Sequence, residues 1–316
     1  MPPYWSVVPF VLLLLSIAIV PLIRPHWWES NLHKGMVSAA LGVVALVWLL
    51  LAAPEGATHR LAITALDYVA FIALLGSLFV VSGGIYVRAA MRGTPGSNMA
   101  LLAVGAVLAS FMGTTGAAVL LIRPLLRANA WRRSRAHLVV FFIFVVANVG
   151  GLLTPLGDPP LYLGFLKGVP FEWTLRLWRE WAMALAAILA VFFVIDTVRF
   201  RAEAREGRSP PEGAREPFGL DGRINLLWLL LIIGAIFGFG LAAKSHWIHE
   251  LERAHPILAE SLLKVGQAVA MAGIALASLR TTAREVRSAN AFNYQPIVEV
   301  AVLFAGIFVT MIPAVW

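Results

Sequence analysis

Residues 148–160 read Asn148-Val-Gly-Gly-Leu-Leu-Thr-Pro-Leu-Gly-Asp-Pro-Pro160. Three glycines, three prolines and one carboxylate therefore interrupt a segment that is otherwise apolar enough for a membrane-spanning helix. Inside a bilayer every backbone N–H and C=O needs a partner, so a broken backbone persists there only where protein or a watery cavity surrounds it. Secondary transporters place ion and substrate sites at such breaks. The stretch therefore predicts ion or solute transport.

The composition predicts a polytopic membrane protein. The chain of 316 residues is 60% hydrophobic and only 13% charged, and its mean hydropathy is +0.82. Most of the apolar runs approach the length of about 20 residues that a spanning helix needs. These runs are Val7–Ile23, Gly35–Pro54, Tyr68–Val87, Met99–Ile122, Leu138–Pro155, Trp181–Asp196, Ile224–Ala243, Leu303–Trp316 and a less uniform one at Pro256–Leu279.

The first run predicts a retained span rather than a cleaved signal peptide. No Lys or Arg precedes it, and the first basic residue is Arg24. A signal peptide carries its positive charge before the apolar run, so we expect an integral protein with its N-terminus outside, in the inner (plasma) membrane of a bacterium. The chain has no cysteine, which excludes disulfides and thiolate metal sites.

The basic residues favour a re-entrant hairpin at 98–127. If this segment enters and leaves on the cytoplasmic side, most Lys and Arg residues fall in cytoplasmic loops, whereas a single crossing divides them more evenly. Gly113-Thr114-Thr115-Gly116 lies in the middle of the segment and suits a tight reversal. The alternative is an ordinary span with a packing face of small residues.

With the hairpin, the predicted fold is an all-α polytopic membrane protein with inverted repeats and about eight spans. Residues 1–198 form the first repeat, with three spans, the hairpin 98–127, the broken span 138–163 and one further span. Residues 199–223 form a solvated cytoplasmic linker. Residues 224–316 begin a second repeat of opposite orientation, since five crossings precede it. This repeat is incomplete, so we expect its remaining hairpin and broken span to lie outside the 316 residues.

Two motifs resemble those of the ion transporter superfamily. They are Gly113-Thr-Thr-Gly-Ala-Ala-Val-Leu-Leu-Ile-Arg-Pro124 and the stretch 148–160. The superfamily includes divalent anion:sodium symporters, arsenite permeases and citrate-transporter-like sodium:proton antiporters. The last branch is the most similar, with Pro296-Ile-Val-Glu-Val-Ala-Val-Leu-Phe-Ala-Gly-Ile-Phe-Val-Thr-Met-Ile-Pro313 as a further point of resemblance.

The resemblance implies a homodimer and an elevator-type mechanism, in which a moving part carries the site across the membrane. It also implies one sodium site in each repeat, built from a hairpin tip and a broken helix. Hydroxyl, amide and carbonyl oxygens suit this hard cation. The residues implied for the first site are Thr114, Thr115, Asn148, Gly150, Gly151 and Thr154. For Asn148, a hydrogen bond between packed helices is the alternative.

Asp158 is the predicted coupling residue. A carboxylate within the membrane is costly and marks an ion or proton path by default. Loss of water favours its protonated form and a nearby sodium ion favours the carboxylate, so the two cations can compete for one site. The negative charge also disfavours an anionic substrate. The alternative for Asp158 is a turn residue before Pro159-Pro160.

Other charged residues of the apolar runs and loops carry separate predictions. Glu299 is a second proton-coupling candidate, with an interfacial position as the alternative. Glu260 and Lys264 are four residues apart, which predicts a local ion pair. Asp196 was expected at the interface beside Arg199, and Arg132 in a basic patch facing lipid headgroups.

Two classes of function therefore remain from the sequence. The first is a cation-coupled secondary transporter, either a sodium:proton antiporter or a sodium- or proton-coupled citrate or dicarboxylate transporter. The second is a non-transporting membrane scaffold or accessory subunit. The sequence contains no catalytic motif that favours an enzyme. We expect no cofactor and no nucleic acid, and we expect the lipid bilayer, a second copy of the chain and a small inorganic cation as partners.

Overall fold

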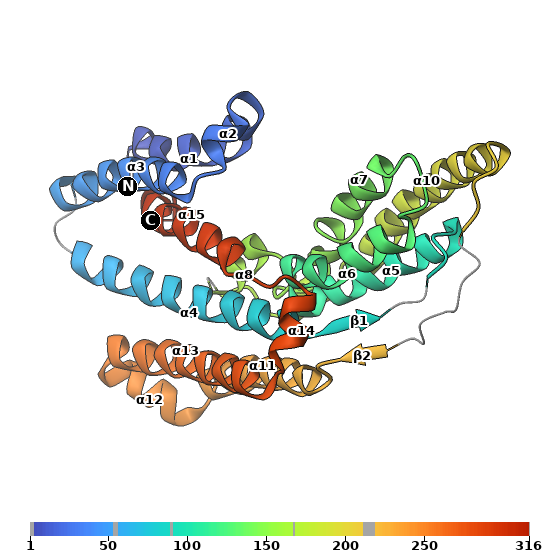
Figure 1. Cartoon of the computed structure of the whole chain (residues 1–316). Coiled ribbons are helices and arrows are strands. Elements are labelled where there is room, and N and C mark those ends of the chain that lie inside the picture. The colour runs from blue at the N-terminus through green and yellow to red at the C-terminus, as the bar shows by residue number, and fades with distance from the viewer. Residues whose placement is uncertain (1–2, 53–55, 89–90, 167, 211–218, 316) are drawn as a thin grey trace. The chain divides into compact units, whose positions relative to one another are not determined.

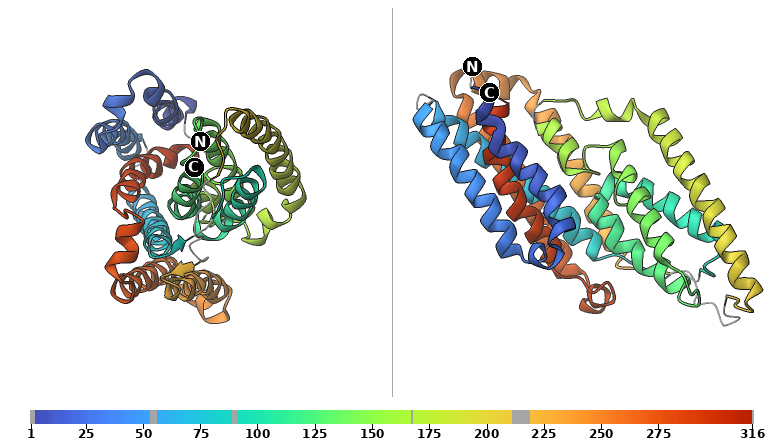
Figure 2. Two further views of the ribbon diagram at one scale, coloured as in Figure 1. Left: turned by 45° about the vertical axis from the view of Figure 1, so that its right-hand side comes forward. Right: turned by 90° about the horizontal axis from the view of Figure 1, so that it is seen from above.

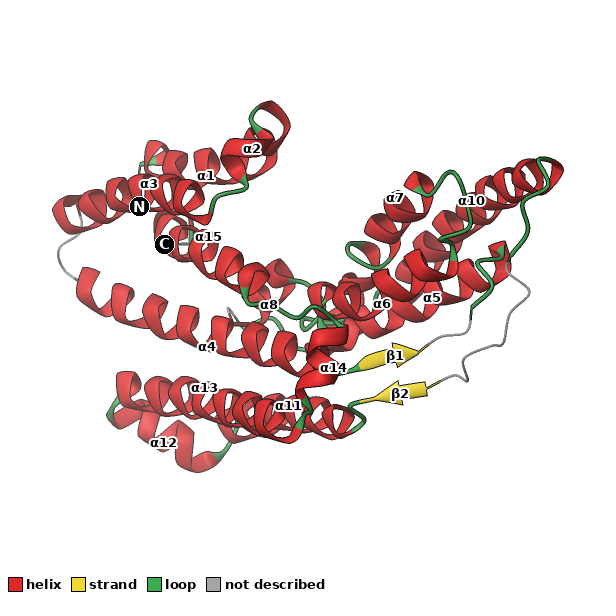
Figure 3. Ribbon diagram, in the orientation of Figure 1, coloured by secondary structure: helices red, strands yellow, loops and turns green. Residues whose placement is uncertain are grey.

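A computed structural model describes residues 3–52, 56–88, 91–166, 168–210 and 219–315 (Figure 1). Helices make up nearly all of the regular structure in these ranges (Figure 3). Nine of the described helical segments are long and apolar enough to cross a membrane. The predicted all-α polytopic membrane protein is confirmed. About eight spans were expected besides the hairpin, and the ninth candidate, Pro95–Met112, lies within the predicted hairpin.

The chain divides into two compact units that do not follow the order of the sequence. Unit 1 contains Met1–Leu74, Ile236–Ala270 and Asn293–Trp316, and unit 2 contains Leu75–Ala235 and Met271–Phe292. Both predicted repeats therefore contribute residues to each unit. Three described helices continue from one unit into the other: α4 Ala57–Gly83, α11 Ile224–Ala243 and α13 Pro256–Thr281.

Unit 1 is built around the packing of two helices from opposite ends of the chain. Besides its parts of α4, α11 and α13, unit 1 contains η1 Tyr4–Val7, α1 Val8–Ile23, α2 Pro25–Trp28, α3 Asn31–Ala52, α12 His246–Ala254, α15 Gln295–Met311 and η3 Ile312–Ala314. Helices α3 and α15 lie side by side (Figures 1 and 2). The Ser38 hydroxyl donates to the Leu303 carbonyl at 3.2 Å across this contact. Small residues allow such close approach of membrane helices.

Gly306 tests this packing. A Cβ at Gly306 would lie 2.4 Å from the Ser38 hydroxyl oxygen and 3.0 Å from the Ser38 Cα. We expect Gly306→Ala to destabilise the protein by about 1–3 kcal/mol, because the Ser38 Cβ, at 2.9 Å, cannot rotate away as the hydroxyl can. Thermal unfolding in detergent measures the effect. Gly42→Ala on α3 is the matched control, since no atom outside its own helix lies within 4 Å of a Cβ there. Equal melting temperatures of the two variants would contradict the close packing.

Unit 2 holds both predicted site motifs. Its other elements are β1 Tyr86–Arg88, α5 Pro95–Met112, α6 Thr114–Ala128, α7 Ala136–Val145, η2 Val149–Leu153, α8 Pro159–Leu166, α9 Glu172–Leu175, α10 Trp178–Arg205, β2 Gly219–Asp221 and α14 Arg284–Ala289. Strands β1 and β2 pair antiparallel, with Val87 opposite Leu220. Of the predicted linker 199–223, the part up to Arg205 continues α10, and residues 211–218 lie outside the described residues.

Candidate functional site

The chain reverses direction at Gly113. This single residue separates α5 from α6, and its φ of 80° lies in the region that favours glycine. The two helices then lie against each other, since a Cβ at Gly105 would be 2.9 Å from the Leu121 side chain. At the open end of the pair, Asn98 and Asn129 exchange hydrogen bonds of 3.0 and 2.8 Å. Helices α5 and α6 therefore form a helical hairpin. Whether it re-enters the membrane from the cytoplasm stays a prediction.

The stretch 148–160 does interrupt a helix. Helix α7 ends at Val145, the short helix η2 covers Val149–Leu153, and α8 begins at Pro159 after an irregular segment. A Cβ at Gly150 would lie 2.7 Å from the Cα of Ala106 on α5. The break thus packs directly on the backbone of the hairpin, and glycine permits this approach.

The hairpin tip and the break contact each other through hydrogen bonds. The Thr114 N–H donates to the Gly157 carbonyl at 3.0 Å, and the Ser110 hydroxyl donates to the Gly150 carbonyl at 2.6 Å. The Thr154 hydroxyl donates back to the Ser110 carbonyl. We call residues 110–115 together with 148–158 the tip–break junction. The two motifs, about 40 residues apart in sequence, therefore form one local structure.

Four predicted site residues have side chains that are available at the junction. Thr114 and Asp158 are half-buried, and Thr115 and Asn148 are exposed. These four side chains make no hydrogen bond or ion pair with any described residue. The proposed interhelical hydrogen bond of Asn148 is thus absent among the described residues. Such uncommitted oxygens are what a hard cation requires.

The other predicted ligands already have partners within the protein. Thr154 is fully buried, and its hydroxyl also accepts from the Leu156 N–H at 3.2 Å. The Gly150 carbonyl accepts from Ser110. Gly151 lies so close to Gly157 that a Cβ would be 2.8 Å from the Gly157 carbonyl oxygen. These residues hold the junction together, whether or not they also contact an ion.

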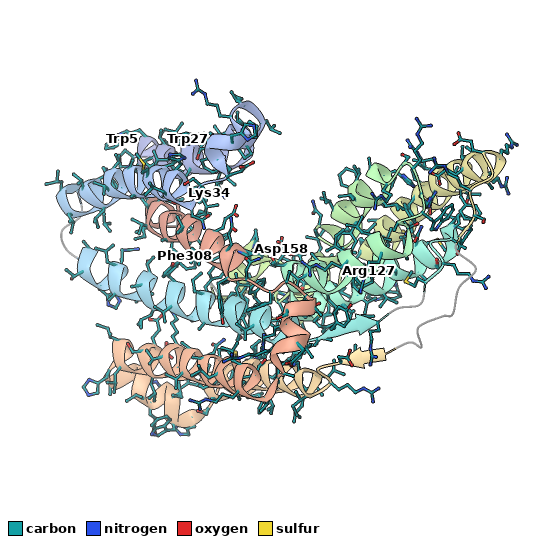
Figure 4. The ribbon with its side chains drawn as sticks, in the orientation of Figure 1. Trp5, Trp27, Lys34, Arg127, Asp158 and Phe308 are labelled. Carbon is teal, nitrogen blue, oxygen red and sulfur yellow. The ribbon has the colours of Figure 1, made fainter. Side chains whose placement is uncertain are left out.

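Asp158 precedes helix α8 at the junction (Figure 4). Its carbonyl accepts from the N–H groups of Leu161 and Tyr162, both at 3.1 Å. Pro159 and Pro160 have no N–H to satisfy, as suits the first helical positions. The main chain of Asp158 therefore makes the turn, and its side chain takes no part in these hydrogen bonds.

Ser110 is a residue of the junction that was not predicted from the sequence. This buried side chain donates to the break, and its carbonyl accepts from Thr154. The signal was present, since Ser110 is the one hydroxyl residue between Met99 and Met112 and lies one turn before the tip. Polar side chains at such positions often join membrane helices.

Three charged residues singled out from the sequence lie in unit 1: Glu260, Lys264 and Glu299. Glu299 forms an ion pair of 2.8 Å with the buried Lys34 of α3. Lys264 pairs with Glu260, which confirms that prediction. Lys264 also pairs with Asp67, a buried carboxylate on α4 that the sequence analysis did not single out.

The prediction for Arg132 was wrong, and Asp196 has a partner that the sequence did not predict. Asp196 was expected at the interface beside Arg199, but it is fully buried and forms an ion pair with Arg132. Arg132 is also buried and does not lie in an exposed headgroup patch. Arg199 instead donates to the Ser134 hydroxyl at 2.7 Å. Local charge pattern placed these residues at the surface, whereas the fold brings opposite charges together from distant segments.

The fold defines a polytopic integral membrane protein in which a helical hairpin is hydrogen-bonded to a broken helix. The family model described as "Putative citrate transport" matches residues 1–316, and the chain belongs to this citrate-transport family. No curated protein and no solved structure matches the chain. Family membership supports a secondary transporter rather than an enzyme.

Proposed function

We propose that this protein is a cation-coupled secondary transporter that exchanges sodium ions for protons at the tip–break junction. The observation that carries the proposal is the direct contact of the hairpin tip with the break, beside an Asp158 side chain that has no partner among the described residues. Broken backbone and an intramembrane carboxylate together are typical of ion pathways.

The ligand chemistry supports sodium. Thr114 and Thr115 supply hydroxyl oxygens, Asn148 supplies an amide oxygen, and Asp158 supplies a carboxylate. Sodium on the carboxylate and a proton on the carboxylate exclude each other. Binding one cation therefore releases the other, and this competition is the basis of antiport.

Citrate uptake is the second candidate, and the family's description favours it. The first turn of α6 lies at the tip, and N–H groups at a helix N-terminus attract anions. The Asp158 carboxylate opposes a nearby anion unless a cation neutralises it first. Citrate transport at this junction would therefore be coupled to sodium or protons.

The compact tip–break junction supports an elevator-type mechanism. The hairpin α5–α6 and the broken helix pack on each other within unit 2, whereas α4, α11 and α13 continue from one unit into the other. We propose that the hairpin and the broken helix move together with the ion, and that the protein works as a homodimer in a bacterial inner membrane with its N-terminus outside.

Proteoliposomes with an internal pH-sensitive dye test the proposal. An inward sodium pulse is expected to drive protons outward and raise the internal pH. Radiolabelled citrate, supplied with and without sodium, tests the second candidate in the same vesicles. Citrate uptake without sodium-driven proton movement would contradict the antiport proposal and support citrate transport. If protein shown to be folded gives neither response, the scaffold function remains.

A further inference from the structure

A second group of interacting polar side chains lies at the open end of the hairpin, in unit 2. Asp196 on α10 accepts from Asn98 of α5 at 2.9 Å and from Arg132. The same carboxylate lies 2.9 Å from Nε2 of His137, near the start of α7. Arg132 also donates to Glu203, about two turns further along α10, at 2.9 Å. We call Asn98, Asn129, Arg132, His137, Asp196 and Glu203 the hairpin-base cluster.

The hairpin-base cluster is shielded from solvent. Asp196 and Asn98 are 0% exposed, Arg132 is 2%, Glu203 6% and His137 7%. Charges at such depth are costly unless opposite charges compensate for them. Charge balance in the cluster therefore matters more than it would at the surface.

With a neutral imidazole, the cluster lacks one positive charge. Asp196 and Glu203 contribute two carboxylates, and Arg132 contributes one guanidinium. The other described groups around them do not supply the missing charge. Asn98, Asn129 and Phe192 are uncharged, and the neighbouring cations Arg133, Arg135 and Arg199 are exposed.

His137 is the group that can supply it. Its Nε2 faces Asp196, and its Nδ1 is buried without a hydrogen-bond partner among the described residues. A proton on the ring nitrogen that neutral imidazole leaves free makes the cluster neutral. It also turns the hydrogen bond to the Asp196 carboxylate into an ion pair between two opposite charges.

We propose that His137 is a proton-binding site outside the tip–break junction, and that its protonation fastens the open end of the hairpin to α10. Without the proton, the cluster carries a net negative charge, and the contact between α5 and α10 weakens. The proposal concerns the hairpin base alone, so it holds whichever ion or substrate the tip–break junction binds.

Spin labels can measure the distance between the open end of the hairpin and α10 directly, because the chain has no cysteine of its own. Gly96→Cys on α5 and Ala202→Cys on α10 are exposed labelling positions, and a Cβ at Gly96 has no contact within 4 Å. Nitroxide distances in the reconstituted full chain are then recorded at about pH 5 and about pH 8, the range over which histidine changes charge. We expect a narrow distance distribution at the lower pH and a broader, longer one at the higher pH.

Two variants shift this response in opposite directions. His137→Gln keeps a hydrogen-bonding side chain but cannot become charged, so the broad distribution is expected at both pH values. Glu203→Gln removes one negative charge, so the cluster is neutral without the proton and the narrow distribution is expected throughout. His246→Gln is the control, since this histidine is exposed on α12.

A pH response that persists in His137→Gln would overturn the proposal. A wild-type distance that does not change with pH would overturn it as well. If His137→Gln does not fold, Glu203→Gln still tests the same charge balance. The distances do not depend on transport. An inactive protein with the expected distances would contradict the proposed function alone, and an active protein without them would contradict this proposal alone.

Discussion

Replacing Asp158 by Asn is expected to reduce sodium-driven proton movement to the rate of protein-free vesicles. Asn has nearly the same shape as Asp and can still form hydrogen bonds, but its side chain neither binds a proton nor carries a charge. Because the Asp158 side chain has no protein partner among the described residues, the substitution breaks no contact described in the fold. The loss would therefore report on the exchange of cations and not on stability.

Asp221→Asn is the matched control for this substitution. Asp221 is an acidic residue on β2 that pairs with Arg88 at 2.8 Å, with both side chains partly exposed. Such pairs contribute little to stability, with a typical value of about 0–1 kcal/mol. We expect its transport to equal that of the wild type in the dye assay. Normal antiport in Asp158→Asn would reduce Asp158 to a turn residue and would move the coupling role elsewhere, with Glu299 as the next candidate.

Gly157→Ala is expected to abolish sodium dependence and to destabilise the protein. A Cβ at Gly157 would lie 2.1 Å from the Gly151 carbonyl oxygen and 2.7 Å from the Gly151 Cα. Both are backbone atoms, so the two sides of the break must separate. The Gly157 carbonyl, which accepts from the Thr114 N–H, must then shift as well. We expect a loss of at least about 1–3 kcal/mol in stability, as overpacking of a tight interior causes.

Sodium-dependent thermal shift in detergent measures both effects of Gly157→Ala. A ligand that binds only the folded state raises the unfolding temperature, so loss of the site removes the shift. Gly164→Ala on α8 is the control, because its nearest contact to a Cβ is the Val169 side chain at 3.8 Å. An unchanged sodium-induced shift in Gly157→Ala would contradict sodium binding at the tip–break junction.

Much of the architecture was predictable because the bilayer restricts the choices of the chain. Apolar runs of spanning length allow hardly any structure except helices, so their positions follow from the sequence. Gly113 and the Gly- and Pro-rich stretch 148–160 locate the reversal and the break, since those residues act on the local backbone. The resemblance to citrate-transporter-like proteins rests on these motifs, and the family match supports it. The sodium:proton branch remains a proposal.

Partnerships between distant side chains were the main failure. The bond from the Thr154 hydroxyl to the Ser110 carbonyl was not predicted, and the role of Thr154 as an ion ligand stays a prediction. Asp196 was assigned to the interface because Arg199 is nearby in sequence, yet Arg132 is its partner. Local spacing succeeded only for Glu260 and Lys264, because four residues make one helical turn and both side chains lie on one face.

The helical membrane class, the reversal at Gly113 and the break at 148–160 therefore followed from local sequence, because hydropathy and backbone preference are properties of each segment alone. Which polar groups are already satisfied became visible only in the packed fold. A hydroxyl or carboxylate is available to an ion when no other segment supplies its hydrogen-bond partner, and that partner comes from distant parts of the chain. Packing thus separated Asp158, whose side chain remains available, from Thr154 and Asp196, which are used to hold the fold.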